Sequence, residues 1–108
     1  YFELNKKYNP GVNNDELKKY HWSIVPHFYS SFYVYKYATG ISASLALSNR
    51  VLKGGEKEKQ DYFTFLRSGG SRYPIESLKV AGVDMTESKP IKDAINTFAN
   101  LVNQIENF

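Results

Sequence analysis

The second half of the chain alternates apolar and polar residues with the period of a helix. The longest apolar stripe recurs every three or four positions and follows Pro90, a residue that suits the first turn of a helix. Its members are Ile91, Ala94, Ile95, Phe98, Leu101, Val102 and Ile105. A further helix is predicted over residues 56–67, closed by the turn at 68–71. Its inward-facing side chains are expected to be Tyr62, Phe63, Phe65 and Leu66.

Residues that typically begin or end helices predict two helices near the beginning of the chain. Residues 1–8 resemble the last two turns of a helix, which the Asn-Pro-Gly run at 9–11 ends, as would fit a fragment of a longer protein. Asn14 or Asp15 can cap the next helix. That helix must stop before Pro26, because the residue preceding a proline is pushed out of the helical region.

A short helix is predicted to start at Pro74 and to end at Gly82. Asp84 and Glu87 follow with the spacing of a capping box. Neither repeats nor low-complexity linkers interrupt the chain, so residues 1–108 are expected to form a single helical unit. The predicted fold class is all-α.

Residues 25–40, VPHFYSSFYVYKYATG, are the most ambiguous part of the sequence. A strand is one interpretation, because a tyrosine or serine recurs at every second position, which is the period of a strand. These residues are Tyr29, Ser31, Tyr33, Tyr35 and Tyr37. However, the run continues without a turn signal into an alanine- and leucine-rich stretch that the glycines at 54 and 55 end. We therefore favour one long helix over residues 28–53, with Gly40 as its only possible break.

If this segment is helical, Tyr29, Tyr33 and Tyr37 are four residues apart and stack on one side. A buried tyrosine needs a hydrogen-bond partner for its hydroxyl, whereas phenylalanine fills a core without that demand. Two interpretations stay open. The row of Tyr29, Tyr33 and Tyr37 is either part of a core, in which each hydroxyl has a hydrogen-bond partner, or, beside His27, a surface that donates hydrogen bonds to a substrate oxygen.

Composition narrows the class of protein. The 108 residues, 42% of them hydrophobic, suffice for one domain with a core. The absence of cysteine excludes disulfides and fits a cytoplasmic location. No apolar run approaches the ~20 residues of a membrane span, so we expect no membrane association. The 14 basic and 11 acidic residues are interleaved, so we expect no nucleic-acid partner either.

Catalytic chemistry complete within this chain is not expected. His21 and His27 are the only histidines, whereas a zinc site needs three or four nitrogen, sulfur or oxygen ligands. The chain has no His-Glu-x-x-His motif. Serines flank the histidines, but without the spacing of a nucleophilic triad. We therefore predict no metal ligand among these residues.

The segment WSIVPHFYSSFYVYKYATG at residues 22–40 resembles the C-terminal signature of oligoendopeptidase F, a zinc peptidase of the thimet-oligopeptidase group. The resemblance continues in order through nearly the whole chain. It includes the glycines at 54 and 55, the SGGS run at 68–71, Tyr73-Pro74 and AGVDM at 81–85.

This resemblance implies that the chain is the helical C-terminal portion of a zincin-type oligopeptidase catalytic domain. In the family, a His-Glu-x-x-His helix and a following glutamate bind zinc, N-terminal to the segment seen here. The fragment itself would bind no zinc and would not be active alone. Its partners would be the remainder of the catalytic domain and short peptide substrates.

The resemblance also implies roles for individual residues. The family places a histidine and tyrosines of this cleft wall opposite the zinc, where they hold the substrate and stabilise the oxyanion. His27 matches the signature histidine, and Tyr33 and Tyr37 fit the catalytic tyrosines best. Tyr29 and Tyr35 are expected to bind substrate. The family's thimet-type members have a glycine-rich stretch where this chain has Phe-Tyr-Ser-Ser, so the pairing of the tyrosines stays open.

The alternative is a non-catalytic α-helical interaction module that shares only the architecture. The two hypotheses differ in what the isolated chain should do. A cleft wall without the rest of its domain exposes aromatic rings and tends to self-associate, whereas a true module should be monomeric and fold cooperatively.

Overall fold

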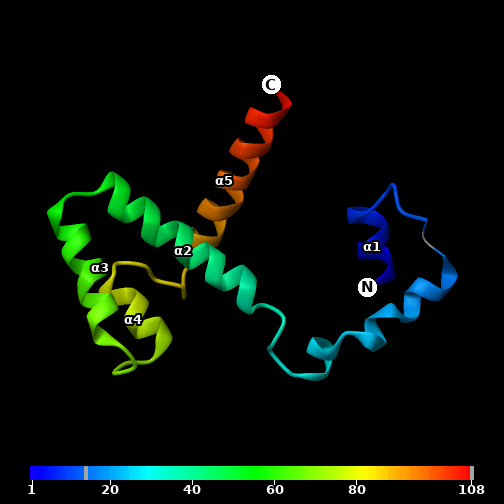
Figure 1. Cartoon of the computed structure of the whole chain (residues 1–108), viewed down its shortest axis with the longest axis horizontal. Coiled ribbons are helices and arrows are strands. Elements are labelled where there is room, and N and C mark those ends of the chain that lie inside the picture. Colours follow the sequence, from blue (N-terminus) through cyan, green and yellow to red (C-terminus); the bar gives the residue numbers. More distant parts are fainter. Residues whose placement is uncertain (14, 108) are drawn as a thin grey trace. The chain divides into compact units, whose positions relative to one another are not determined.

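A computed structural model describes residues 1–13 and 15–107 (Figure 1). These residues form helices joined by turns and contain no strand, so the predicted all-α class is confirmed. The chain divides into two compact units, Tyr1–Tyr35 and Lys36–Phe108, which are described separately below. The single-domain organisation stays a prediction.

The first unit contains three short helical segments. Helix α1 spans Phe2–Tyr8 and ends, as predicted, at Asn9, whose backbone N–H donates to the carbonyl of Asn5 at 2.9 Å. The 3₁₀ helix η1 spans Glu16–Ile24, and the Asp15 carboxylate accepts from the backbone N–H of Leu17 at 2.7 Å. The predicted cap at Asp15 is therefore confirmed, while Asn14 lies outside the described residues. A second 3₁₀ turn, η2, spans Pro26–Tyr29.

The predicted helix over residues 28–53 is wrong in its first third. Helix α2 spans Lys36–Lys53 and includes Gly40, but residues 30–35 form an irregular turn. Aromatic residues lose side-chain freedom in a helix, and serines offer the backbone competing hydrogen bonds. This composition allows the chain to leave the helical path between η2 and α2. The strand interpretation is also wrong, because residues 30–35 form this turn and contain no strand.

The second unit packs four helices around a small core. After α2 come α3 (Glu56–Ser68), α4 (Pro74–Val80) and α5 (Lys89–Glu106), at the positions predicted. Helix α2 contacts both α5 and α3, and α3 contacts α4. Among the described residues, the buried apolar side chains are small: Ala43, Ala81 and Val83. The core therefore fixes the helix positions without enclosing any large side chain completely.

The predicted inward face of α3 is only half correct. Tyr62 and Phe65 are half-buried, whereas Phe63 and Leu66 are exposed. Four apolar residues within five positions spread around the helix, so a single neighbouring surface cannot cover them all.

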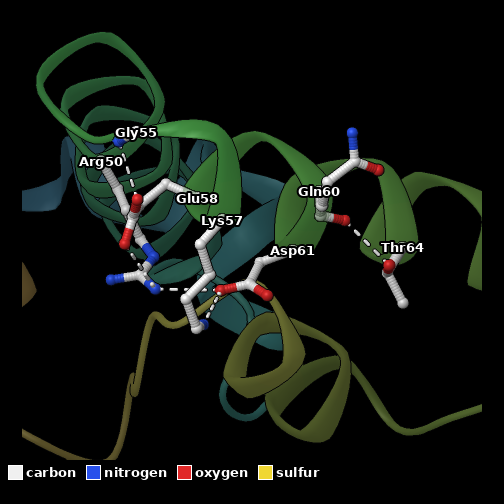
Figure 2. Close-up of polar contacts among 7 residues, drawn as sticks. All are labelled: Arg50, Gly55, Lys57, Glu58, Gln60, Asp61 and Thr64. Atoms are coloured by element: carbon white, nitrogen blue, oxygen red, sulfur yellow. Dashed lines mark hydrogen bonds and ion pairs between the residues drawn. The ribbon is translucent and has the colours of Figure 1, made fainter.

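Ion pairs hold the corner between α2 and α3 (Figure 2). Arg50, near the end of α2, lies 3.0 Å from the Asp61 carboxylate and 3.7 Å from that of Glu58. Lys57 contacts the same Asp61 oxygen at 2.7 Å, and Glu58 accepts from the backbone N–H of Gly55 at 2.8 Å. The hydrogen bonds from Lys57 and Arg50 lower the pKa of Asp61. The bond from Gly55 is the main cause of the lowered pKa of Glu58.

The turn between α3 and α4 begins at Ser68, as predicted. The Ser68 hydroxyl donates to the carbonyl of Phe65 at 2.6 Å, and the Ser71 N–H donates to the carbonyl of Ser68 at 3.1 Å. Gly69 adopts a positive φ of 51°, which glycine tolerates without strain. A Cβ atom added at Gly69 or Gly70 would meet no atom within 4 Å, so this turn is open to solvent.

The predicted capping box at Asp84 is wrong, because α5 begins only at Lys89. Asp84 instead closes a turn. One of its carboxylate oxygens accepts from the Thr86 backbone N–H at 2.9 Å and from the Thr86 hydroxyl at 2.6 Å. The other oxygen lies 3.0 Å from the Lys79 ammonium. These contacts, those with Thr86 first, lower the pKa of Asp84 from 3.8 to about 2.

Replacing Thr86 by alanine is expected to raise the pKa of Asp84 towards its ordinary value, because the hydroxyl donor is lost. A lowered pKa in the folded state stabilises the fold above pH 3.8, and that stabilisation disappears as the pH falls towards 2. NMR titration of the Asp84 carboxylate in both proteins measures the change. Thr97→Ala is the control, since the Thr97 hydroxyl donates to the carbonyl of Asp93. An ordinary Asp84 pKa in the unmodified chain would contradict this account.

Candidate substrate-binding site

His27 and Tyr33 form a ring pair in the first unit. Their ring centroids are 5.1 Å apart and the planes are tilted by 35°. His27 belongs to η2, where Pro26 occupies the first helical position and lacks only an N–H that would have no partner there. Tyr33 lies in the irregular turn of residues 30–35 and is 39% exposed. An imidazole and a phenol, both hydrogen-bonding groups, are therefore held side by side near the surface.

The turn that brings Tyr33 back to His27 passes through a left-handed residue. Phe32 has a φ of 56°, and its side chain is 87% exposed. This conformation costs a residue other than glycine about 1–2 kcal/mol. Strain of this kind concentrates at binding and catalytic sites, where the surrounding structure maintains it. Nothing in the sequence predicts this turn, because a glycine, the usual residue at a positive φ, is absent from it.

The three tyrosines predicted to stack do not share one helix. Tyr29 lies in η2, Tyr33 in the irregular turn and Tyr37 in the first turn of α2. The helical spacing that grouped Tyr29, Tyr33 and Tyr37 on one side is therefore not the spacing of these residues. Tyr37 is 83% exposed and Tyr35 is 56% exposed, so both side chains lie at the surface.

The Tyr29 hydroxyl has a definite partner. It donates to the carbonyl of Ser23 at 2.6 Å and so joins η2 to the end of η1. A phenol has a single proton to donate, so Tyr29 can contact a further group only as an acceptor while this bond persists. Its position supports the segment that carries His27.

The second histidine, His21, contacts aromatic residues of the first unit. The Tyr1 hydroxyl lies 3.5 Å from Nδ1 of His21, and the rings of these residues meet edge to face. Tyr1 also contacts Phe28 edge to face, with centroids 6.1 Å apart. These contacts connect α1 to η1 and η2.

Two open cavities lie in the second unit. One, of about 380 Å³, is lined mainly by polar residues around Arg50, and it includes Asp84 and Asp93. The other, of about 530 Å³, is mostly apolar and lies between α2, α3 and α4. Neither is lined by His27 or the candidate tyrosines. Sequence reasoning missed Arg50, whose acidic partners are eight and eleven residues away, beyond the range of a local helix pattern.

In residues 1–13 and 15–107, no three histidine or acidic side chains gather closely enough to hold a metal ion. Among the same residues, no helix is long and apolar enough to cross a membrane. What the site offers chemically is a set of hydrogen-bonding groups, of the kind that holds a peptide carbonyl or stabilises a negatively charged oxygen.

Comparison with known proteins defines the class as a peptidase. The model of peptidase family M3 matches residues 1–97, which include all the candidate site residues. The chain belongs to peptidase family M3.

Individual relatives support the resemblance to oligoendopeptidase F. The chain is 47% identical over 107 residues to the oligopeptidase PepF of Bacillus subtilis, covering 98% of this chain and 16% of that protein. It is 41% identical to an oligoendopeptidase F homolog of Borreliella burgdorferi and 38% identical to the plasmid oligoendopeptidase F of Lactococcus lactis subsp. cremoris. Each of these matches covers 98% of this chain and 18% of the relative. The chain thus matches a fragment of such an enzyme, and no solved structure matches it.

Proposed function

We propose that this chain is the C-terminal part of a zinc-dependent oligoendopeptidase that hydrolyses short peptides. Its role is to form the cleft wall that binds the substrate and stabilises the oxyanion. The observation that carries the proposal is the close pairing of His27 with Tyr33, maintained by a strained backbone at Phe32, in a chain of peptidase family M3. The working enzyme is expected in the cytoplasm.

The zinc of such an enzyme would be held by residues outside this chain. The two histidines alone are too few for a zinc site, which needs three or four nitrogen, sulfur or oxygen ligands. Zinc would supply a Lewis acid that polarises the peptide carbonyl and activates water. The remainder of the catalytic domain is therefore the necessary partner, and the chain alone is inactive.

The residues of this chain act on the substrate through hydrogen bonds. His27, Tyr33 and Tyr37 donate to the oxygen that becomes negatively charged as the peptide carbonyl is attacked. Such a donor contributes more to the transition state than to the bound substrate, because the charge is present only there. Tyr35 donates to the substrate backbone, and Tyr29 contacts it as an acceptor.

The test uses a chimaera in which this chain replaces the matching 107-residue segment of the Bacillus subtilis relative. We expect the chimaera to hydrolyse a short fluorogenic peptide and the chain alone to show no hydrolysis. A zinc chelator should abolish the activity of the chimaera, and added zinc should restore it.

Two outcomes would contradict the proposal. One is hydrolysis by the isolated chain, which would place the whole reaction within these residues. The other is a folded chimaera whose hydrolysis survives chelation. A chain that is monomeric and folds cooperatively, with no effect on hydrolysis in the chimaera, would instead favour the interaction module.

A further inference from the structure

Helix α5 exposes a long apolar surface. Its members Ile91, Ile95, Phe98, Leu101 and Ile105 are spaced three or four residues apart and so lie along one side, here called the α5 face. Phe98 is 68% exposed and Ile105 is 74% exposed. The face runs over the whole length of the helix, from its first turn to its last.

The α5 face is not the side by which the helix packs against α2. The side chains of α5 that are buried or half-buried in its first three turns are Pro90, Asp93, Ala94 and Thr97. At 100° per residue, the centre of this group lies roughly a quarter of a turn from the centre of the α5 face. The later turns of α5 extend away from α2, α3 and α4 (Figure 1). The contact with α2 therefore leaves most of the apolar face uncovered.

The α5 face contains no charged residue. Lys92, Asn96, Asn100, Asn103 and Gln104 lie on the opposite side of the helix, where they suit contact with water. An uncharged row of large apolar side chains is unusual on the surface of a soluble monomer and marks a contact surface. The partner that fits it is an equally apolar, uncharged surface.

The length of the relatives identifies that partner. The three relatives described above align with 98% of this chain, but the chain spans only 16–18% of their length. Each relative thus has more than four-fifths of its chain available to cover the corresponding helix. A partner surface on the same polypeptide acts at a higher effective concentration than a second molecule.

We infer that the α5 face packs against the remainder of the peptidase, and not against a second copy of this chain. The inference deepens the proposed function, because it names the surface by which the cleft wall is attached. It rests on the family membership and on the exposure of α5, and on no catalytic role of His27 or the tyrosines.

Thiol labelling tests the inference directly, because the chain contains no cysteine. Phe98→Cys and Ile95→Cys place a thiol on the α5 face, while Asn96→Cys and Asn100→Cys are matched controls on its opposite side. Each variant is treated with a maleimide as the isolated chain and within the chimaera, and mass spectrometry locates the label. In the isolated chain all four thiols should react.

In the chimaera, the thiols at 95 and 98 should react at least about tenfold more slowly than those at 96 and 100, since a buried thiol reacts only when the structure opens locally. Equal rates at all four positions of a folded chimaera would overturn the inference. Protection at 95 and 98 that appears only in a dimeric fraction of the chimaera, identified by light scattering, while both thiols react in the monomeric fraction, would also overturn it and assign the face to self-association.

If the chimaera does not fold, the same test is made in a second protein. The same four substitutions are then made at the matching positions of the Bacillus subtilis relative. Protection there supports the inference, and uniform labelling rejects it. The result is independent of the proposed function, because labelling is read without substrate and a catalytically dead chimaera would give the same pattern.

Discussion

Replacing Tyr37 by phenylalanine in the chimaera is expected to lower kcat about 10²–10³-fold, the usual effect of removing one oxyanion donor. The substitution removes only the hydroxyl of a side chain that is 83% exposed, so the fold should not change. KM should change little, because the lost hydrogen bond forms fully only in the transition state. Steady-state kinetics with a short fluorogenic peptide, together with the melting temperature, measure both effects.

Tyr33→Phe should lower kcat by a similar factor. If both hydroxyls act on the same oxygen, the double variant should lose less than the product of the two single losses. Tyr73→Phe is the control, since this exposed tyrosine precedes α4 and has no proposed role. An unchanged kcat for Tyr37→Phe would remove that tyrosine from the mechanism, and the same result for Tyr33→Phe would leave the His27 pair without a catalytic function.

Gly54→Ala is expected to destabilise the second unit by about 2–3 kcal/mol, the upper part of the range for overpacking. A Cβ atom at this position would lie 2.5 Å from the Arg50 carbonyl and 2.4 Å from a side-chain carbon of Glu58. The carbonyl is backbone and cannot move aside without breaking its hydrogen bond from the Gly54 N–H. Urea unfolding of the chain, followed by helical circular dichroism, measures the loss.

The adjacent glycine provides the matched control. A Cβ atom at Gly55 would meet only a carboxylate oxygen of Glu58, at an ordinary distance of 3.7 Å. Gly55→Ala should therefore cost only the helix-cap preference for glycine over alanine, roughly 0.5–1 kcal/mol. Equal losses at the two positions would show that the close approach at Gly54 is not what makes glycine necessary there.

Helices whose ends are marked by proline or glycine were predictable from the sequence. Helices α3, α4 and α5 begin and end where prolines, glycines and apolar spacing place them, because these residues act locally on the backbone. The exposure of the α5 face was not predictable in the same way. Apolar spacing tells which side of a helix avoids water, and it does not tell whether the covering surface belongs to these 108 residues.

The segment around the candidate site was the least predictable. Its tyrosines fit both a strand period and a helical period, and the structure has neither over residues 30–35. The decisive feature is the positive φ of Phe32, which no local rule assigns to an aromatic residue. His27 and Tyr33 were both candidates from the resemblance, but their direct contact depends on that turn and could not be derived from spacing.

The 3₁₀ geometry of η1 could not be predicted from the sequence. Over nine residues, a period of 3.0 and one of 3.6 differ by about half a turn in total, so the apolar pattern predicts a helix without its type. The same holds for Asp84, where capping-box spacing is present but the side chain closes a turn five residues before α5 begins.

The open turn at Ser68–Ser71 has a consequence for how this family can diversify. Its two central glycines have free space around them, and the turn is closed by hydrogen bonds among its own serines and Phe65. Lengthening a surface loop costs little, since closure entropy grows only with the logarithm of loop length. Extra residues, or a whole inserted module, can therefore be accepted between α3 and α4 while the ion pairs of Arg50 remain in place.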